Sequence, residues 1–326
     1  MPQISIKRRE DLHISKIYSN FAAQNCLSMA KIGVFDSGYG GLTILEAIRK
    51  ELPQYDYLYL GDNARAPYGT HSFDVIYRYT LEAVQYLFAH DCALVILACN
   101  TASAKALRTI QQKDLPEINR LRVTGYGLQG KPVNVLGVIR PTVEAVPAIT
   151  KTRHVGILAT PATVSSESYV LELEKIAPAL TISQQACPMW VPLIESGEHH
   201  TPGAKYFVGE YLRQILAKDP KIDTLVFGCT HYPLLKEVID GWLAYHYQIE
   251  ESEFPKPQKA THITTIAQGE LVADSLKNYL SRHPEYREQL SQGGSCRYLT
   301  TENADRFSQS ATNFLDTPIV AEHLDL

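Results

Sequence analysis

Two short apolar segments of this chain each end at a cysteine that small polar residues follow. Their sequences are LVILACNT at residues 94–101 and LVFGCTH at residues 225–231. Each apolar run is long enough for one buried strand, and a helical pattern follows each. In open α/β sheets such junctions lie at the crevice where ligands bind, because the strands end there and the next helix presents free N–H groups. The duplication predicts one site in which two cysteines face each other.

Strand and helix patterns alternate along most of the chain. Strand-like runs cover Lys31–Phe35 and Tyr57–Leu60, and a helix with one apolar face follows each of them. We interpret the mixed stretch Glu117–Asn134 as a linker or insertion. Beyond it, Val135–Ile139 and Val155–Leu158 are strand-like, and a third run leads to the second cysteine. This order predicts parallel sheets covered by helices on both faces, which is an α/β fold.

The length of 326 residues predicts about two domains, because one core usually covers fewer residues. We expect residues 1–28 to be an N-terminal extension. Residues 29–118 together with 235–326 should form the first α/β domain, and residues 119–234 the second, with the active site in the cleft between them. The tail contains a weak strand near Thr261–Ile266, which we expect to complete the sheet of the first domain.

Composition excludes several classes of protein. The formal net charge is -4, and the basic residues form no stripe, so nothing favours binding to nucleic acid. The longest apolar runs fall well short of a membrane span, and the first residues lack the apolar stretch of a signal peptide. Six cysteines without regular spacing indicate thiols in a reducing compartment, so we expect a cytoplasmic protein. We interpret Cys26, Cys92, Cys187 and Cys296 as buried apolar filler or inert surface thiols.

The two matched cysteines suggest acid/base chemistry. At a helix N-terminus the dipole and the free N–H groups favour thiolate, which should lower the pKa of Cys99 and of Cys229. Thiols on two separate domains suit removal of a proton from one face of a carbon and donation to the other. The alternative is that each cysteine is a small buried residue that closes a strand.

A carboxylate and an imidazole accompany these thiols. Asp36 ends the first strand near the expected place of Cys99, where it would relay the thiol's proton or hold a substrate ammonium. His231 lies two residues after Cys229 and would serve that thiol in the same way. For both residues, capping or ordering a loop is an equally good interpretation.

The loop at residues 36–41 is rich in glycine but does not fit a nucleotide site. Gly38 and Gly40 match the first two glycines of G-x-G-x-x-G, whereas the third position is Thr43. A carboxylate at the mouth of the loop would also repel pyrophosphate. We expect these glycines to let the backbone approach a small substrate closely.

Five segments in the same order give the chain a specific resemblance. They are GVFDSGYGGLT at 33–43, GD at 61–62 with PYG at 67–69, ACNTA at 98–102, VPLIESG at 191–197 and GCTHYP at 228–233. From Lys31 to about Leu315 the chain resembles the glutamate racemases of the aspartate/glutamate racemase family. The resemblance implies two α/β domains, a homodimer, and cofactor-independent conversion of L-glutamate to the D-glutamate of bacterial peptidoglycan. No metal site is implied.

The resemblance also implies roles for individual residues. Cys99 and Cys229 would act on opposite faces of the α-carbon and exchange roles with the direction of the reaction. Asp36 would assist Cys99, and His231 would assist Cys229. Two further polar residues, Asp62 and Glu195, would complete the catalytic group at the cleft. The residues implied to hold the ammonium and carboxylates of glutamate are Asp36, Ser37, Tyr68, Gly69, Asn100, Thr101, Thr230 and His231.

Other functions remain open on the sequence alone. An aspartate racemase would share the paired cysteines, although the Thr-His pair after Cys229 favours glutamate. Cys229 and His231 would also suit a hydrolase nucleophile and its base, which would leave Cys99 idle. A zinc site is disfavoured, because no C-x-x-C or paired-histidine spacing supplies the ligands. As a non-catalytic alternative, the protein would bind and regulate another protein.

Three segments depart from the family pattern. Residues 1–28 precede the usual beginning of the family, and we expect them to be disordered or translation to begin at Met29. The stretch Arg120–Gln129 looks like an insertion near the hinge. The turn Ala267–Gln268–Gly269 replaces the acidic-glycine turn that is usual after the late strand.

Overall fold

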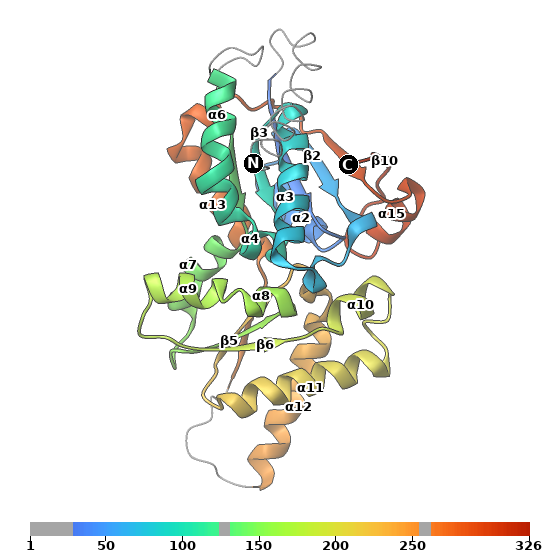
Figure 1. Cartoon of the computed structure of the whole chain (residues 1–326). Coiled ribbons are helices and arrows are strands. Elements are labelled where there is room, and N and C mark those ends of the chain that lie inside the picture. Colours follow the sequence, from blue (N-terminus) through green and yellow to red (C-terminus); the bar gives the residue numbers. More distant parts are fainter. Residues whose placement is uncertain (1–28, 124–130, 254–261) are drawn as a thin grey trace, which may run out of the picture.

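Two stacked α/β domains make up the protein (Figure 1). The computed structural model describes residues 29–123, 131–253 and 262–326. The expectations for residues 1–28, and for most of the insertion at 120–129, therefore lie outside the described residues. Every strand pair is parallel, which confirms the predicted fold class. Within the described ranges, no helix combines the length and apolarity that crossing a bilayer requires.

The upper sheet has six strands in the order β10-β9-β2-β1-β3-β4. Their bounds are β1 Lys31–Asp36, β2 Tyr57–Gly61, β3 Cys92–Leu97, β4 Asn134–Gly137, β9 Cys296–Thr300 and β10 Ala321–His323. Side chains alternate between its faces: Ile32 and Val34 pack in the cluster that holds α2 (Gly41–Glu51) and α13 (Gly269–Arg282), and Phe35 packs with α3 (Phe73–Ala89). Burial on both faces explains why these strands are apolar throughout.

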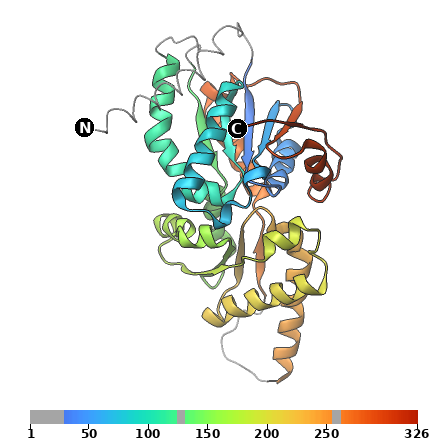
Figure 2. The ribbon, with the colours of Figure 1, turned by 45° about the vertical axis from the view of Figure 1, so that its right-hand side comes forward.

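The lower sheet has four strands in the order β6-β5-β7-β8. Their bounds are β5 His154–Ala159, β6 Thr181–Ala186, β7 Thr224–Gly228 and β8 Thr264–Ile266. One face packs with α7 (Ile139–Ile149) and α9 (Ser168–Ile176). The other packs with α10 (Trp190–Glu195), α11 (Pro202–Lys218) and α12 (Lys236–Glu253), the last of which points away from the upper domain in Figure 2.

The shorter elements connect these layers. The remaining helices of the described ranges are α4 (Asn100–Lys105), α5 (Leu107–Thr109), α6 (Leu115–Val123), α8 (Pro161–Ser165), α14 (Pro284–Arg287) and α15 (Ala304–Ala311). The single turns are the 3-10 turns η1 (Asn63–Arg65), η2 (Tyr68–Thr70) and η4 (Tyr232–Leu235), and the π turn η3 (Ile110–Asp114).

Two strands belong to the opposite sheet from the one that we expected. Strand β4, expected in the second domain, pairs with β3 in the upper sheet. Strand β8, expected to complete the first domain's sheet, pairs with β7 in the lower sheet. The expected boundaries at 119 and 235 are therefore wrong for these strands. Their local patterns do not reveal the error, because pairing partners are distant in the sequence.

Several other elements differ from the sequence interpretation. The stretch expected to be a linker contains helix α6. We did not predict β6, β9 or β10. Strand β6, with the sequence TISQQA, is a partly exposed edge strand whose residues carry no continuous apolar run. Strands β9 and β10 are the part of the tail that extends the upper sheet.

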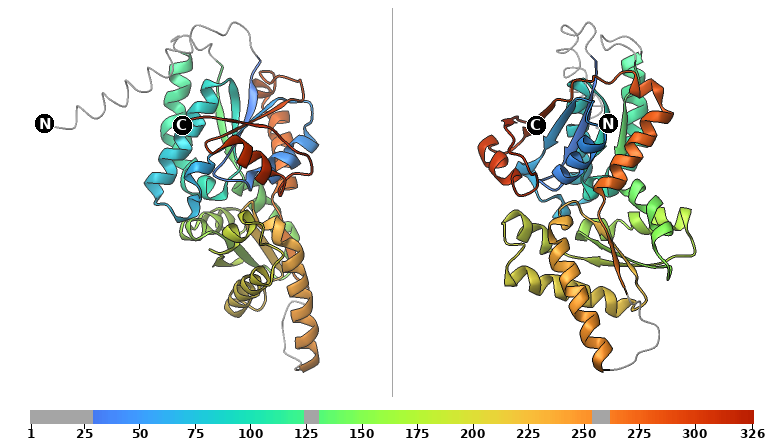
Figure 3. Two further views of the ribbon diagram at one scale, coloured as in Figure 1. Left: turned by 90° about the vertical axis from the view of Figure 1, so that its right-hand side faces the viewer. Right: turned by 180° about the vertical axis from the view of Figure 1, so that it is seen from behind.

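The chain crosses between the domains at two points. Strand β4 ends at Gly137 and α7 begins at Ile139, so Val138 forms the first crossing. Strand β8 ends at Ile266 and α13 begins at Gly269, so the second crossing is formed by residues 267 and 268. In the view from behind (Figure 3, right), the orange chain after α12 rises through the lower sheet into α13 of the upper domain. These crossings form the hinge between the two domains.

Candidate active site

Each sheet has one point at which the strand order reverses. In the upper sheet β1 lies between β2 and β3, and Phe35 pairs with Leu97 beside the reversal. In the lower sheet β5 lies between β6 and β7, and Ala159 pairs with Gly228. Ligands of open α/β sheets bind at such points, outside the carboxyl ends of the strands. Each cysteine junction lies at the reversal point of its own sheet.

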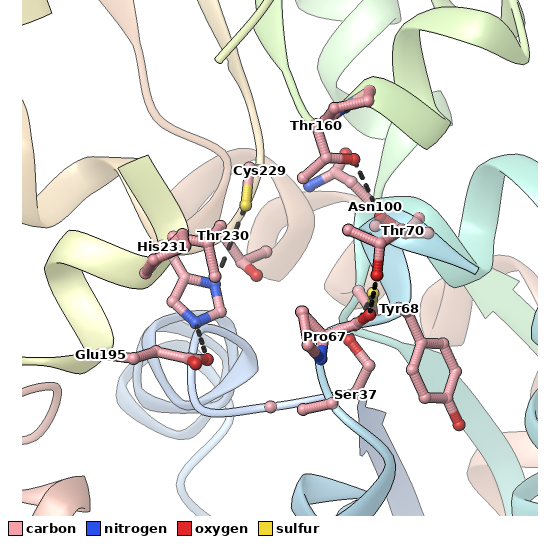
Figure 4. A pocket seen from close by; sticks show the side chains of 18 of the residues that line it. Ser37, Pro67, Tyr68, Thr70, Asn100, Thr160, Glu195, Cys229, Thr230 and His231 are labelled. Carbon is pink, nitrogen blue, oxygen red and sulfur yellow. Dashed lines mark hydrogen bonds and ion pairs between the residues drawn. The ribbon is translucent and has the colours of Figure 1, made fainter. Parts of the chain in front are cut away.

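The two reversal points face one cavity between the domains. Cys99 and Cys229 both line it, as the sequence predicts. All the other predicted site residues except Asp62 line it as well: Asp36, Ser37, Tyr68, Gly69, Asn100, Thr101, Glu195, Thr230 and His231. Figure 4 shows Cys229, His231 and Glu195 in a row, with Thr160, Asn100 and Thr70 across the cavity from them.

Cys99 is held in a buried position at the start of α4. Its thiol accepts a hydrogen bond from the N–H of Ala102 at 3.4 Å and lies 3.1 Å from the Ser37 hydroxyl. The expectation of a lowered pKa is wrong for this residue. Burial, and then the carboxylate of Asp36, raise the pKa of Cys99 to about 12 and outweigh both hydrogen bonds. These surroundings therefore favour the thiol form of Cys99 over the thiolate.

Asp36 orders the glycine loop and also faces the cavity. Its Oδ2 accepts hydrogen bonds from the N–H of Gly38 at 3.1 Å and of Gly41 at 2.9 Å. Burial raises the pKa of this carboxyl above its usual value, although nearby His231 and these N–H groups partly offset the effect. The loop-ordering interpretation is therefore confirmed. It does not compete with a role near Cys99, because the same carboxyl lies close enough to perturb that thiol.

Cys229, His231 and Glu195 form a second chain of polar contacts. The sulfur of Cys229 lies 3.8 Å from Nδ1 of His231, and Nε2 of His231 lies 2.9 Å from a Glu195 oxygen. Burial lowers the pKa of His231, but the hydrogen bonds and charges of Cys229 and Glu195 outweigh it and raise this pKa well above its usual value. His231 is therefore placed to exchange a proton with Cys229 while Glu195 holds its other nitrogen.

The second cysteine does not begin an α-helix. Cys229 is followed by Thr230, His231 and the single 3-10 turn η4, so the expected helix N-terminus is absent at this thiol. The two cysteines therefore have different surroundings despite their similar sequences. The imidazole of His231 lies beside one thiol, and a helix N–H together with a hydroxyl lies beside the other.

The glycine loop contacts the other domain, and Gly38 also lines the cavity, so the close approach of this backbone to a substrate stays a prediction. A Cβ atom added to Gly40 would lie 2.4 Å from His231 Nδ1 and 2.6 Å from Thr230 Oγ1. A Cβ atom on Gly38 would lie 3.0 Å from an oxygen of Glu195. Thr43 adds a hydrogen bond to the Thr230 carbonyl at 3.2 Å. The glycines thus permit the two halves of the site to meet.

Asp62, unlike the other predicted site residues, does not line the cavity. Its buried carboxylate accepts hydrogen bonds from Tyr68, from Arg65 at 2.7 Å and from Thr301 at 2.9 Å. Tyr68 stands between Asp62 and the cavity that Tyr68 itself lines. Asp62 therefore supports the Tyr68–Gly69 turn from behind.

Sequence reasoning missed two groups of the cavity. Thr160 follows β5 at the reversal point of the lower sheet, and its hydroxyl lies 3.1 Å from that of Thr101. Its position directly after a predicted strand was the signal in the sequence that could have identified it as a site residue. Cys187, which we interpreted as filler, is buried and also lines the cavity. Its thiol donates a hydrogen bond to the backbone carbonyl of Gln185 at 3.6 Å, and this carbonyl is neither an acid nor a base.

The Glu195 carboxylate allows a direct test of the Cys229 side of the site. We expect Glu195→Gln to lower kcat about 10- to 100-fold, because a charge-assisted hydrogen bond to the imidazolium is lost. The pKa of His231 should fall as well, so the decline of activity at alkaline pH should begin at lower pH. Steady-state kinetics across pH measure both effects. The exposed Glu198→Gln is the matched control, and equal profiles for the two variants would contradict this role.

A cavity between two parallel α/β domains, with Cys99 on one side and the Cys229–His231 pair on the other, is typical of enzymes that move a proton between the two faces of one carbon. Comparison of the sequence with known protein families supports this assignment. The family model described as Asp/Glu/Hydantoin racemase matches residues 42–244. The chain therefore belongs to the Asp/Glu/Hydantoin racemase family, which confirms the resemblance seen in the sequence.

Within this family, the chain is similar to several glutamate racemases. The chain is 39% identical to a glutamate racemase of Ruegeria sp. over 89% of this chain and 98% of that protein. It is 38% identical to the glutamate racemase of Paracoccus denitrificans over 88% and 97% of the two chains. A glutamate racemase structure from Francisella tularensis in complex with D-glutamate superposes with a TM-score of 0.73 at 28% identity, covering 92% of this chain and 98% of that one. A Bacillus anthracis glutamate racemase gives a TM-score of 0.74 at 28% identity over 91% and 98%.

Proposed function

We propose that this protein interconverts L- and D-glutamate by a two-base reaction without a cofactor, and so supplies D-glutamate for peptidoglycan. The observation that supports this proposal most directly is that the thiols of Cys99 and Cys229, one from each domain, line one cavity. The curated relatives named as glutamate racemases, similar over nearly their whole length, support glutamate as the substrate.

The proposed reaction moves one proton at a time. The thiolate of one cysteine removes the α-proton of glutamate, and the thiol of the other then donates its proton to the opposite face of the carbanion. The product is the other enantiomer, and the enzyme is left with thiol and thiolate exchanged. A positioned acid or base of this kind contributes roughly 10²–10⁴-fold to the rate. The buried Asp36 serves the Cys99 side, and His231 with Glu195 serves the Cys229 side.

The polar side chains across the cavity suit the remaining groups of the substrate. Asn100, Thr101 and Thr160 are buried, and they provide an amide and hydroxyls for carboxylate oxygens. Ser37, Thr230 and the Tyr68–Gly69 turn complete the proposed set. Because Asn100, Thr101 and Thr230 are buried, their contacts act with reduced competition from water.

One assay tests the proposal. Purified protein free of metal and pyridoxal is incubated with L-glutamate in heavy water, and products are analysed early. We expect D-glutamate labelled at the α-carbon while the remaining L-glutamate stays unlabelled, because separate groups remove and donate the proton. Label in both enantiomers from the start would contradict two distinct bases. Turnover of aspartate alone, or a covalent acyl-enzyme at Cys229, would contradict glutamate racemisation itself.

A homodimer and a cytoplasmic location are also part of the proposal. Light scattering of the purified protein measures its mass in solution. A mass of one chain of 36.5 kDa at all concentrations would contradict the dimer.

A further inference from the structure

The carboxamide of Gln268 lies at the second crossing between the domains, where the sequence departs from the family pattern. It is almost fully buried, with 2% of its surface exposed, and it does not line the cavity. Its Oε1 accepts a hydrogen bond from Nδ2 of Asn100 at 2.5 Å. Its Nε2 lies 2.9 Å from Tyr169 Oη and 2.9 Å from Thr142 Oγ1. A buried amide with this many partners is rarely neutral to fold or function.

Three of these side chains form a closed ring of hydrogen bonds. Asn100 donates to Gln268, Gln268 donates to Tyr169, and Tyr169 donates to Oδ1 of Asn100 at 2.7 Å. The carbonyl of Val138, which can only accept, lies 3.3 Å from Gln268 Nε2 and so fixes the direction of these bonds. If the Asn100 amide were flipped, its oxygen would face Oε1 of Gln268 and its NH₂ would face a hydroxyl that already has a donor. Hydrogen bonds from Gln268 and Tyr169, which do not line the cavity, therefore set the orientation of the Asn100 amide.

The ring contacts both segments in which the chain crosses between the domains. Gln268 itself belongs to the second crossing. Its Nε2 lies 3.3 Å from the carbonyl of Val138, which forms the first crossing. Its partner Thr142, in the first turn of α7, donates to the same carbonyl at 2.9 Å. A weaker contact of 3.2 Å joins Gln268 Nε2 to Asn100 Oδ1. One side chain thus links the hinge to a residue of the cavity wall.

We propose that Gln268 is a positioning residue: it holds the Asn100 amide so that one N–H points to the substrate, and it ties this amide to both hinge segments. The inference rests on the proposed function, because it deepens the binding role given to Asn100. Of the two Nδ2 hydrogens of Asn100, the ring uses one and leaves the other for the cavity. Substrate binding should therefore depend on a residue that the substrate does not touch.

Replacing the carboxamide separates positioning from stability. In Gln268→Met the chain length is kept but both hydrogen-bonding ends are lost, so the Asn100 amide keeps only the bond from Tyr169 and is held less firmly. We expect the KM for glutamate, and the Kd measured by calorimetry, to rise about tenfold. The kcat should change less than threefold, since Asn100 binds substrate and transition state alike. The matched control is Gln185→Met, which removes a buried amide bonded to Gln214 at 2.7 Å in the lower domain. It should lower stability without changing KM.

If Gln268→Met does not fold, a milder variant still tests the inference. Tyr169→Phe removes only the hydroxyl of the ring and should raise KM in the same way. Because both residues act through one amide, the double variant should raise KM no further than the larger single effect. Multiplying effects, or KM and Kd values equal to those of Gln185→Met, would overturn the inference. Wild-type protein that neither binds nor racemises glutamate would overturn the proposed function instead.

Discussion

Alanine at Cys99 or at Cys229 is expected to abolish racemisation, with kcat/KM lowered by roughly 10²–10⁴-fold or more. In the proposed path each thiol is the group that exchanges a proton with the α-carbon on its side, and Asp36, His231 and Glu195 assist these thiols without taking their place. Steady-state assays with both enantiomers measure the loss. Cys296→Ala is the control, because that thiol lies outside the cavity and should leave the rate unchanged.

The two alanine variants should differ in one respect. A protein that keeps a single thiol can still remove the α-proton of one enantiomer and return a solvent deuteron to the same face. We therefore expect exchange without inversion, with L-glutamate as the substrate for one variant and D-glutamate for the other. Nuclear magnetic resonance in heavy water follows this exchange. If both variants label the same enantiomer, the two thiols do not lie on opposite faces of the substrate.

A methyl group at Gly40 is expected to inactivate the protein although Gly40 takes no part in the chemistry. The new Cβ would overlap Nδ1 of His231, the atom that faces Cys229, at 2.4 Å, and the Thr230 hydroxyl at 2.6 Å. A displacement of about 1 Å at a reacting group costs on the order of 10²-fold in rate. Overpacking between the domains should also cost about 1–3 kcal/mol of unfolding free energy. Kinetics and denaturant unfolding measure the two effects.

The matched control for Gly40→Ala is Gly241→Ala on the exposed side of α12. No atom lies within 4 Å of the Cβ that this change adds. Alanine suits a helix interior better than glycine, so we expect the unfolding free energy to rise by about 0.5–1 kcal/mol with kcat unchanged. A Gly40→Ala protein with normal kcat would show that His231 does not need its present position.

Much of the architecture could be predicted from local patterns. The apolar runs that became β1, β2, β3, β5 and β7 are buried on both faces of their sheets, so their residues carry a continuous signal. Strand β6 is half exposed at an edge, and its polar residues carry no such signal. Strands β4 and β8 were predicted as strands but assigned to the wrong sheet, for a different reason. Their sheet is set by partners in register with them, and pairing partners leave no local trace.

The site divides in the same way. The sequence by itself determined which residues stand at the strand ends, and hence that Cys99, Cys229, Asp36 and His231 would meet, because the carboxyl ends of parallel strands share one edge. Only the tertiary structure decided their environment. It raised the pKa of Cys99, turned Asp62 away from the cavity, placed His231 against Gly40, and buried Gln268 behind Asn100. Burial, charge and close packing depend on neighbours from distant parts of the chain, and these come together only when the two domains close on each other.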